Sequence, residues 1–193
     1  MYPLFETIAI KDGKPCNIGY HQERYKRSLM AWYGSDFCVI DLAKFIAQHP
    51  MPTDLTNLPL VRCRLDYNNR TQTVQYFAYT PRSIRHFAPV VCDDIDYRLK
   101  YSDRTQLDSL RHDHARDDGE IMIVKHGFIT DCSIGNLVFR RHGEWFTPAT
   151  PLLHGTQRQY LLDNARISLR DIRPHELELF EDIRLINALN GLP

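Results

Sequence analysis

Polar and hydrophobic residues alternate along two neighbouring stretches of the chain, and this pattern predicts a long β-hairpin. Residues 60–67 place hydrophobic side chains at every second position, and residues 71–79 show the same period of two. Side chains on a strand point alternately to opposite faces, so this period is typical of strands with one buried face. The polar sequence Asn68-Asn69-Arg70 supplies the turn between them.

Strands and helices are also expected before this hairpin. Residues 5–10 and 15–20 are predicted to form two strands around the turn at Asp12-Gly13. Hydrophobic residues at helical spacing follow over residues 21–33, and Gly34 can end that helix. A second helix is expected over residues 41–48, with Asp41 as its N-cap.

The second half of the chain adds more short strands and two helices. Residues 90–99 indicate a strand that leads to Lys100, and Ser102 or Asp103 can cap a helix after it. The remaining expected elements are strands over residues 120–124, 128–130, 136–139, 144–146 and 183–186 and a helix over residues 156–165. This arrangement predicts an α+β fold with mostly antiparallel strands. We expect two subdomains within one compact unit, residues 1–88 and residues 89–193, with Lys100 in the second.

Composition narrows the classes of function. A chain of 193 residues with 43% hydrophobic residues can bury a substantial core, and its formal net charge of zero gives no electrostatic reason to bind nucleic acid or membranes. The five cysteines lack metal-ligand spacing, so no metal site is expected. Neither a signal peptide nor a membrane-spanning run is visible, and a reducing cytoplasm is the expected location.

Lys100 is the most distinctive candidate for chemistry. It is one of six lysines, against eighteen arginines, and it lies between Leu99 and Tyr101 where the expected strand gives way to a helix. A lysine in partly apolar surroundings loses its proton more readily and can act as a nucleophile. From spacing alone, an ion pair with Asp96 or Asp103 is the favoured alternative.

Four further sites are individually weak but chemically complementary. Arg24 lies on a helix, where a solvated arginine is common, and residues 130–136 form a polar, acid-containing turn between two strands. Gly155 leads into a helix whose first N–H groups can bind an anion, and residues 186–191 close a strand with small and polar residues. Together with Lys100 they offer an amine, anion donors and a carboxylate. Pyridoxal 5′-phosphate (PLP) needs these groups for its aldehyde, phosphate and ring nitrogen.

The order of these pieces resembles the class IV aminotransferases, also called fold-type IV PLP enzymes. The resemblance runs from about Phe5 to Pro193. The segments that carry it are His21-Gln22-Glu23-Arg24, Lys100, Glu120-Ile121-Met122-Ile123, Thr130 to Asn136, Thr147-Pro148 and Gly155-Thr156-Gln157-Arg158. Each segment is short, but their shared order is specific.

The resemblance implies a role for each matching residue. Lys100 would form the Schiff base and move the substrate's α-proton, Arg24 would bind the phosphate, and Asp131 would face the pyridine nitrogen. The other implied cofactor contacts are Ser133, Gly155, Ala188 and the helix-start N–H groups of Thr156 and Gln157. Arg104 and Tyr79 are candidates for substrate contacts. The family also implies a homodimer, with the cofactor between the two subdomains.

Within the family, the chain looks most like aminodeoxychorismate lyase. The segments that carry this likeness are Lys100-Tyr101-Ser102-Asp103-Arg104, Thr130-Asp131-Cys132 and Gly155-Thr156-Gln157-Arg158-Gln159. The likeness implies elimination of pyruvate from an amino acid-like substrate. Transamination of branched-chain or D-amino acids is the alternative within the family, and PLP binding without catalysis is the alternative of another class.

Two departures from the family pattern bear on the substrate and the electron sink. Asp131 replaces the usual glutamate and is one methylene shorter, which weakens the expected contact with the ring nitrogen. The opening strand of many relatives is absent from this sequence, and that segment helps to line the substrate side, so the substrate class stays open.

Overall fold

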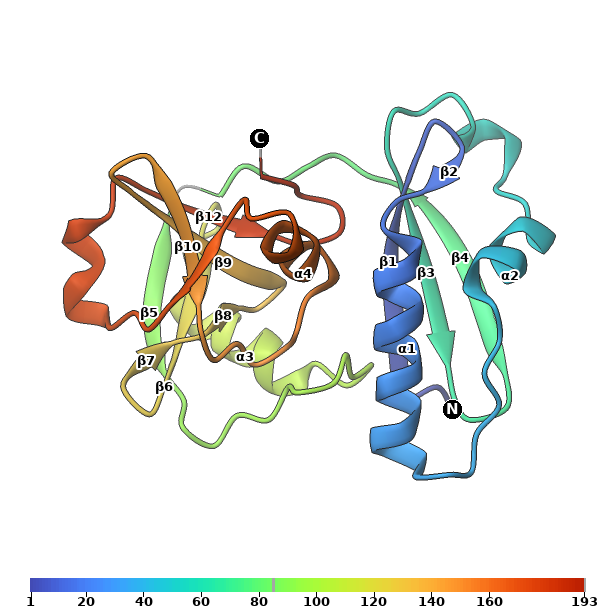
Figure 1. Ribbon diagram of the computed structural model, residues 1–193, viewed down its shortest axis with the longest axis horizontal. Helices are drawn as coiled ribbons and strands as arrows, with labels where there is room; N and C mark the ends of the chain where they lie inside the picture. The colour runs from blue at the N-terminus through green and yellow to red at the C-terminus, as the bar shows by residue number, and fades with distance from the viewer. Residues whose placement is uncertain (85, 193) are drawn as a thin grey trace. The chain divides into compact units, whose positions relative to one another are not determined.

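The computed structural model describes residues 1–84 and 86–192 and confirms the α+β fold. The chain forms two compact units (Figure 1). The first comprises Met1–Pro81 and Leu99–Asp103, and the second comprises Arg82–Arg98 and Arg104–Pro193. Strands pair antiparallel except for two parallel pairs among the described residues, both in the second unit.

The first unit is built on one antiparallel sheet. Its strands, in spatial order, are β2 (Lys14–Pro15), β1 (Leu4–Lys11), β3 (Val61–Tyr67) and β4 (Gln72–Ala78). The predicted hairpin is β3 and β4, paired in register from Val61 opposite Ala78 to Tyr67 opposite Gln72. Alternate residues of β3 are buried, which is what the period of two predicted.

Helix α1 (Ile18–Tyr33) packs its buried face on this sheet. The helix starts three residues before the predicted position, and the expected strand over residues 15–20 is reduced to the two residues of β2. Asn17 adopts a left-handed conformation, φ 52°, which ends β2 and starts the helix. Helix α2 (Leu42–Gln48) is capped as predicted, because Asp41 accepts the Lys44 N–H at 3.0 Å; a short 3-10 turn, η1 (Thr53–Leu55), follows.

The second unit contains two sheets and two helices. In one sheet β6 (Glu120–Lys125) lies between β5 (Phe87–Val91) and β7 (Phe128–Ile129). The other sheet has the order β11 (Ser168–Arg170), β10 (Glu144–Pro148), β9 (Gly135–Arg141) and β12 (Asp182–Ile186), with β8 (Asp131–Cys132) paired to β9. The helices are α3 (Thr105–His114) and α4 (Thr156–Asp163), with a 3-10 segment, η2 (Pro174–Leu179). Met122, Leu137 and Phe139 are fully buried at the centre of this unit.

The segment around Lys100 differs from the sequence prediction. The strand ends at Val91 and does not continue to Leu99, and the helix that follows begins at Thr105 with Arg104 as its N-cap. The Phe5 N–H donates to the Lys100 carbonyl at 3.1 Å, and the Ser102 N–H donates to the Pro3 carbonyl at 2.8 Å. These backbone bonds join Lys100 to β1 of the first unit, and the two units divide between Pro81 and Arg82.

Within the described ranges, no helix has both the length and the hydrophobicity that a membrane span requires.

Candidate active site

Lys100 lies half-buried beside strand β1 of the first unit. Its Nζ is 4.6 Å from the centroid of the Phe5 ring, a cation–π distance. The hydrogen bond between the Phe5 N–H and the Lys100 carbonyl fixes the backbone at the same point. Asp96, one of the partners that spacing suggested for Lys100, forms an ion pair with Arg98 at 3.5 Å. The amine therefore lies against an aromatic ring of β1.

Arg24 is buried on the inner face of α1, where it meets a carboxylate from β1. Its Nε donates to Glu6 Oε1 at 2.8 Å and its Nη2 donates to Glu6 Oε2 at 2.5 Å. His21, one helical turn earlier, shares the same carboxylate through Nδ1 and Oε2 at 2.6 Å. The exposed fractions are 6% for Arg24 and 0% for both Glu6 and His21. The arginine is thus a fixed, desolvated group and not a solvated one.

The charges of this cluster are set by its contacts. Burial by itself raises the pKa of Glu6, but the charge and hydrogen bonds of Arg24, with those of His21, outweigh it and hold the pKa at about 2. Burial lowers the pKa of His21, and the nearby charges of Arg24 and Lys100 lower it further, against the pull of Glu6. At neutral pH the carboxylate is ionised, so the His21 nitrogen that faces it carries the proton.

Asp131 is the buried acid of the second unit, with 4% of its surface exposed. Its Oδ1 accepts the Asn136 side-chain amide at 2.8 Å, and its Oδ2 accepts the Leu153 N–H at 2.8 Å. Burial raises the pKa of Asp131 to about 6, although these two bonds and the charge of Arg158 oppose the rise. The acid is therefore ionised at neutral pH, with a narrower margin than Glu6.

Two asparagines tie three turns of the second unit together. Asn136 Nδ2 bridges from Asp131 to the Leu153 carbonyl at 2.9 Å, which joins the acid-containing turn to the start of α4. A Cβ placed on Gly155 would lie 1.9 Å from Asn136 Oδ1, so only glycine allows this approach. Asn187 Nδ2 donates to the Ile134 carbonyl at 3.1 Å and brings in the turn after β12. The sequence segments that were weak alone are neighbours in this unit.

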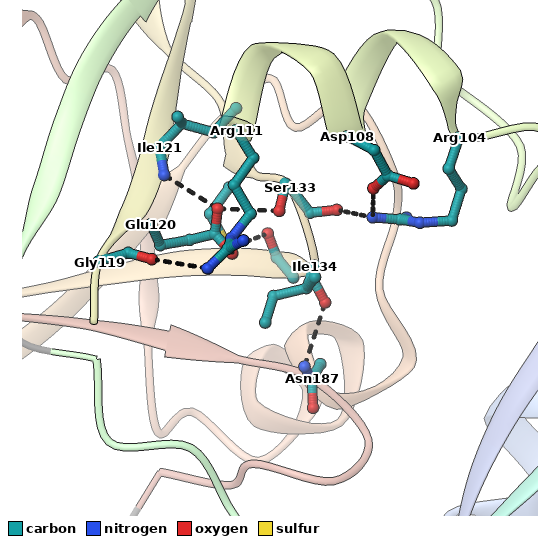
Figure 2. A network of polar contacts seen from close by, with 11 residues as sticks. Arg104, Asp108, Arg111, Gly119, Glu120, Ile121, Ser133, Ile134 and Asn187 are labelled. Carbon is teal, nitrogen blue, oxygen red and sulfur yellow. Dashed lines mark hydrogen bonds and ion pairs between the residues drawn. The ribbon is translucent and has the colours of Figure 1, made fainter. Parts of the chain in front are cut away.

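A second polar network contacts Ser133 and Ile134 of the acid-containing turn (Figure 2). The Ser133 hydroxyl donates to Glu120 Oε1 at 2.8 Å, and the Ser133 carbonyl accepts Arg104 Nη2 at 2.9 Å. Arg104 also contacts Asp108, at 3.2 Å, and the Tyr97 hydroxyl, at 3.2 Å. In this structure the contacts of Ser133 and Arg104 therefore stabilise the conformation of the turn.

The remaining predicted site residues lie at the start of α4, in the turn after β12 and at the end of β4. Thr156 is buried at the start of α4, and Gln157 lies half-buried near Gly191. Ala188 lies in the Asn187–Asn190 turn, and Tyr79 directly follows β4 in the first unit. The structure thus groups Lys100 with Arg24 in the first unit and Asp131, Ser133, Gly155 and Thr156 in the second.

Sequence reasoning assigned no role to Glu6, and it named Glu120 and Asn136 only as parts of motif segments, without their structural roles. Glu6 and Glu120 carried a usable signal, since each is a lone acid in or beside an otherwise apolar strand. A buried acid needs a partner, and such positions are therefore candidates for a site. Among residues 1–84 and 86–192, no group of three or more His, Cys, Asp or Glu side chains could hold a metal ion.

Comparison with known proteins identifies the family. The model of the amino-transferase class IV family matches residues 3–193. The chain belongs to this family. A solved structure from Haemophilus somnus 129PT, provisionally named 4-amino-4-deoxychorismate lyase, is 49% identical to this chain. The alignment covers 100% of this chain and 98% of the other, with a TM-score of 0.92.

Two more distant proteins are also similar to this chain. One from Schizosaccharomyces pombe, provisionally named aminodeoxychorismate lyase, is 29% identical and is aligned over 96% of this chain and 85% of its own length. A hypothetical aminotransferase from Mycobacterium tuberculosis, solved in a PLP-bound form, shares the fold with a TM-score of 0.73 at 18% identity, over 98% of this chain and 78% of its own. The resemblance that the motifs indicated is confirmed at the level of the family.

Proposed function

We propose that this class IV protein is a PLP-dependent enzyme that eliminates pyruvate from an aminodeoxychorismate-like substrate. The observation that carries the proposal is full-length similarity, at 49% identity, to a protein provisionally named for that reaction. The more distant relative of the same provisional name adds support. Lys100 and Arg104 keep the spacing that the lyase branch of the family implies.

The chemistry of the individual residues supports the proposal of PLP as cofactor. Lys100 offers an amine, Arg24 a desolvated guanidinium, and the start of α4 offers backbone N–H groups with the positive end of a helix dipole. Asp131 offers a carboxylate that is ionised above a pKa of about 6. These are the groups that an aldehyde, a phosphate and a pyridinium nitrogen require, and PLP supplies an electron sink for carbanion chemistry when it is bound.

Each residue then has a definite task. Lys100 supplies the amine for the aldehyde and carries a proton at Nζ. Arg24 and the N–H groups of Thr156 and Gln157 would bind the phosphate, and Gly155, Ser133 and Ala188 would shape the turns that carry these contacts. Asp131 would keep the ring nitrogen protonated.

Arg104 and Tyr79 are proposed to contact the substrate. A cytoplasmic homodimer completes the proposal, and five unpaired cysteines suit a reducing compartment.

The first prediction tests the lysine. Wild-type protein mixed with PLP should show a visible absorption band, and borohydride should fix the cofactor on Lys100, as mapped by mass spectrometry. Lys100→Arg keeps the charge but lacks the nucleophilic amine, so it should give no adduct. Lys44→Arg, a change at an exposed lysine of α2, is the matched control and should behave as wild type.

The outcome of turnover then separates the reactions. Release of pyruvate together with 4-aminobenzoate from aminodeoxychorismate supports the lyase. Amino-group transfer from branched-chain or D-amino acids to a 2-oxo acid would replace it by a transaminase. An adduct on Lys100 without either reaction would leave a cofactor-binding protein, and an adduct on another lysine would refute the assignment of Lys100.

A further inference from the structure

The buried Glu6–His21–Arg24 cluster is larger than phosphate binding alone would need. One guanidinium is enough to contact a phosphate, and a carboxylate beside it opposes the binding of an anion. Yet Glu6 is fully buried and takes three hydrogen bonds, two from Arg24 and one from His21. Buried ion pairs rarely add net stability compared with apolar side chains of similar size, so stability alone is a weak explanation.

The geometry of the Glu6–Arg24 pair gives a more specific explanation of the cluster. Glu6 is engaged through Nε and Nη2, which together form one edge of the planar guanidinium fork. Two parallel bonds fix both the position and the plane of the group, because neither bond survives a rotation of the fork. The other N–H groups of the guanidinium, on Nη1 and on the outer side of Nη2, belong to different edges of the same plane. A phosphate that binds Arg24 through those groups would meet donors whose plane Glu6 has already set.

His21 completes the support. It lies one turn before Arg24 on α1 and contacts Glu6 Oε2 at 2.6 Å, on the oxygen that also accepts Nη2. Because burial keeps its pKa low, His21 stays neutral and orients Glu6 without adding a second positive charge that would pull the carboxylate from the arginine. Strand β1 carries Glu6 and the first turns of α1 carry the other two, so regular elements and not loops hold the cluster.

We propose that Glu6 is a positioning residue for cofactor phosphate recognition, holding the Arg24 guanidinium in the one orientation that selects PLP over its unphosphorylated form. This inference rests on the proposed function, in which Arg24 binds the phosphate. Glu6 would act through Arg24, without contacting the cofactor itself, and would set the preference for a phosphorylated ligand.

The test compares two ligands that differ only in the phosphate. Dissociation constants of PLP and pyridoxal are measured by visible absorbance for wild type and for Glu6→Asp, which keeps the charge but withdraws the acceptor by one methylene, about 1.5 Å. The expected result is a loss of PLP affinity on the order of tenfold, the size of one charge-assisted bond, with pyridoxal affinity unchanged. Glu23→Asp is the matched control, since Glu23 is an exposed acid of α1 paired with Lys26 at 3.3 Å, and it should change neither constant.

The outcomes separate the two levels of the proposal. A wild-type protein without preference for PLP over pyridoxal would refute the assignment of Arg24, and the inference with it. A wild-type preference that Glu6→Asp leaves intact, or equal losses for both ligands, would refute the positioning role alone.

His21→Phe guards against poor folding of the first variant. This variant replaces the imidazole by an apolar ring of similar size and so removes one hydrogen-bond donor to Glu6. It should lower the preference for PLP over pyridoxal severalfold. An unchanged preference in this variant, with thermal unfolding showing a folded protein, would also contradict the inference.

Discussion

Two of the buried acids, Glu6 and Asp131, are held by different kinds of partner. Glu6 accepts hydrogen bonds from a guanidinium, and Asp131 accepts them from a side-chain amide and a backbone N–H, neither of which is charged. A positive charge in contact stabilises the ionised form far more than neutral donors do. The pKa values of about 2 and about 6 follow from that difference. A buried carboxyl group therefore stays ionised down to low pH in the first unit, whereas in the second unit it titrates near neutral pH.

Gly155 should be the least tolerant glycine of the candidate site. In Gly155→Ala the new Cβ would lie 1.9 Å from Asn136 Oδ1, so Asn136 has to move and gives up its bonds to Asp131 and the Leu153 carbonyl. We expect a loss of about 2–3 kcal/mol, the size of an overpacked core with unsatisfied polar groups. Urea unfolding followed by Trp145, a residue of the second unit, measures it.

Gly19 provides the matched control for that change. It lies in α1, and no atom lies within 4 Å of the position that an added methyl group would take. Gly19→Ala should therefore raise stability by about 0.5–1 kcal/mol through the helix preference for alanine. Equal effects of the two substitutions would contradict the role of Asn136.

At the scale of elements, the sequence predicts correctly those helices and strands that local signals determine. The β3–β4 hairpin and the capped helix α2 are confirmed, because alternation, a polar turn and an Asp N-cap each act within a few residues. The start of α1 was predicted too late, since Ile18-Gly19-Tyr20 fits a strand as well as a helix and Asn17 gives no side-chain cap bond. The strand before Lys100 was extended too far because the chain there pairs with β1, almost a hundred residues away in sequence.

The same distinction applies to the candidate site. The order of motifs indicates Lys100, Arg24 and Asp131 as a set, although no single motif does. The partners that hold them could not be predicted, because Glu6 meets Arg24 across 18 residues and Leu153 meets Asp131 across 22. Such pairings depend on how sheets and helices pack, and no local pattern records them.

The turn after β12 should depend on one side chain. Asn187 Oδ1 accepts from the Leu189 N–H, the Asn190 N–H and the Asn190 side-chain amide, each at 2.9 Å. Asn187→Ala should therefore speed amide hydrogen exchange at Leu189 and Asn190 by roughly ten- to a hundredfold, the equivalent of about 1.4–3 kcal/mol of local opening.

Asn187→Asp separates the two ends of that side chain. It keeps the acceptor and loses the donor to the Ile134 carbonyl, so exchange in the turn should rise less than in Asn187→Ala. If both variants exchanged at the wild-type rate, the backbone alone would hold the turn.

At the scale of the molecule, each unit has its own core and its own reporter. Leu4, Tyr25, Leu65 and Tyr67 are buried together in the first unit, and Met122, Leu137 and Phe139 in the second. The two tryptophans are divided between them, with Trp32 on α1 and Trp145 on β10. Single-tryptophan variants can therefore follow the unfolding of each unit separately.

The two units should respond to acid in opposite directions. In the first unit the folded pKa of Glu6, about 2, lies below its ordinary 4.5, so its stabilisation is complete above pH 4.5 and is lost as the pH falls toward 2. His21 acts in the same sense, because its lowered pKa makes the folded state lose stability as the pH falls below 6.5. In the second unit the folded pKa of Asp131, about 6, lies above its ordinary 3.8, so stability is gained as the pH falls from 6 to 3.8.

Urea unfolding between pH 7 and pH 4 therefore distinguishes the units. Asp131 contributes about 3 kcal/mol between pH 6 and pH 3.8, since one pKa unit corresponds to about 1.4 kcal/mol. In the first unit His21 acts from pH 6.5 downward, whereas Glu6 begins to act only below pH 4.5. With Trp145 replaced by phenylalanine, the Trp32 signal should show a midpoint that falls on acidification. With Trp32 replaced by phenylalanine, the Trp145 midpoint should hold or rise over the same range, because protonation of Asp131 removes a buried charge. Two midpoints that fell together would contradict the raised pKa of Asp131, and with it the view that the acid of the candidate site is the one that titrates near neutral pH.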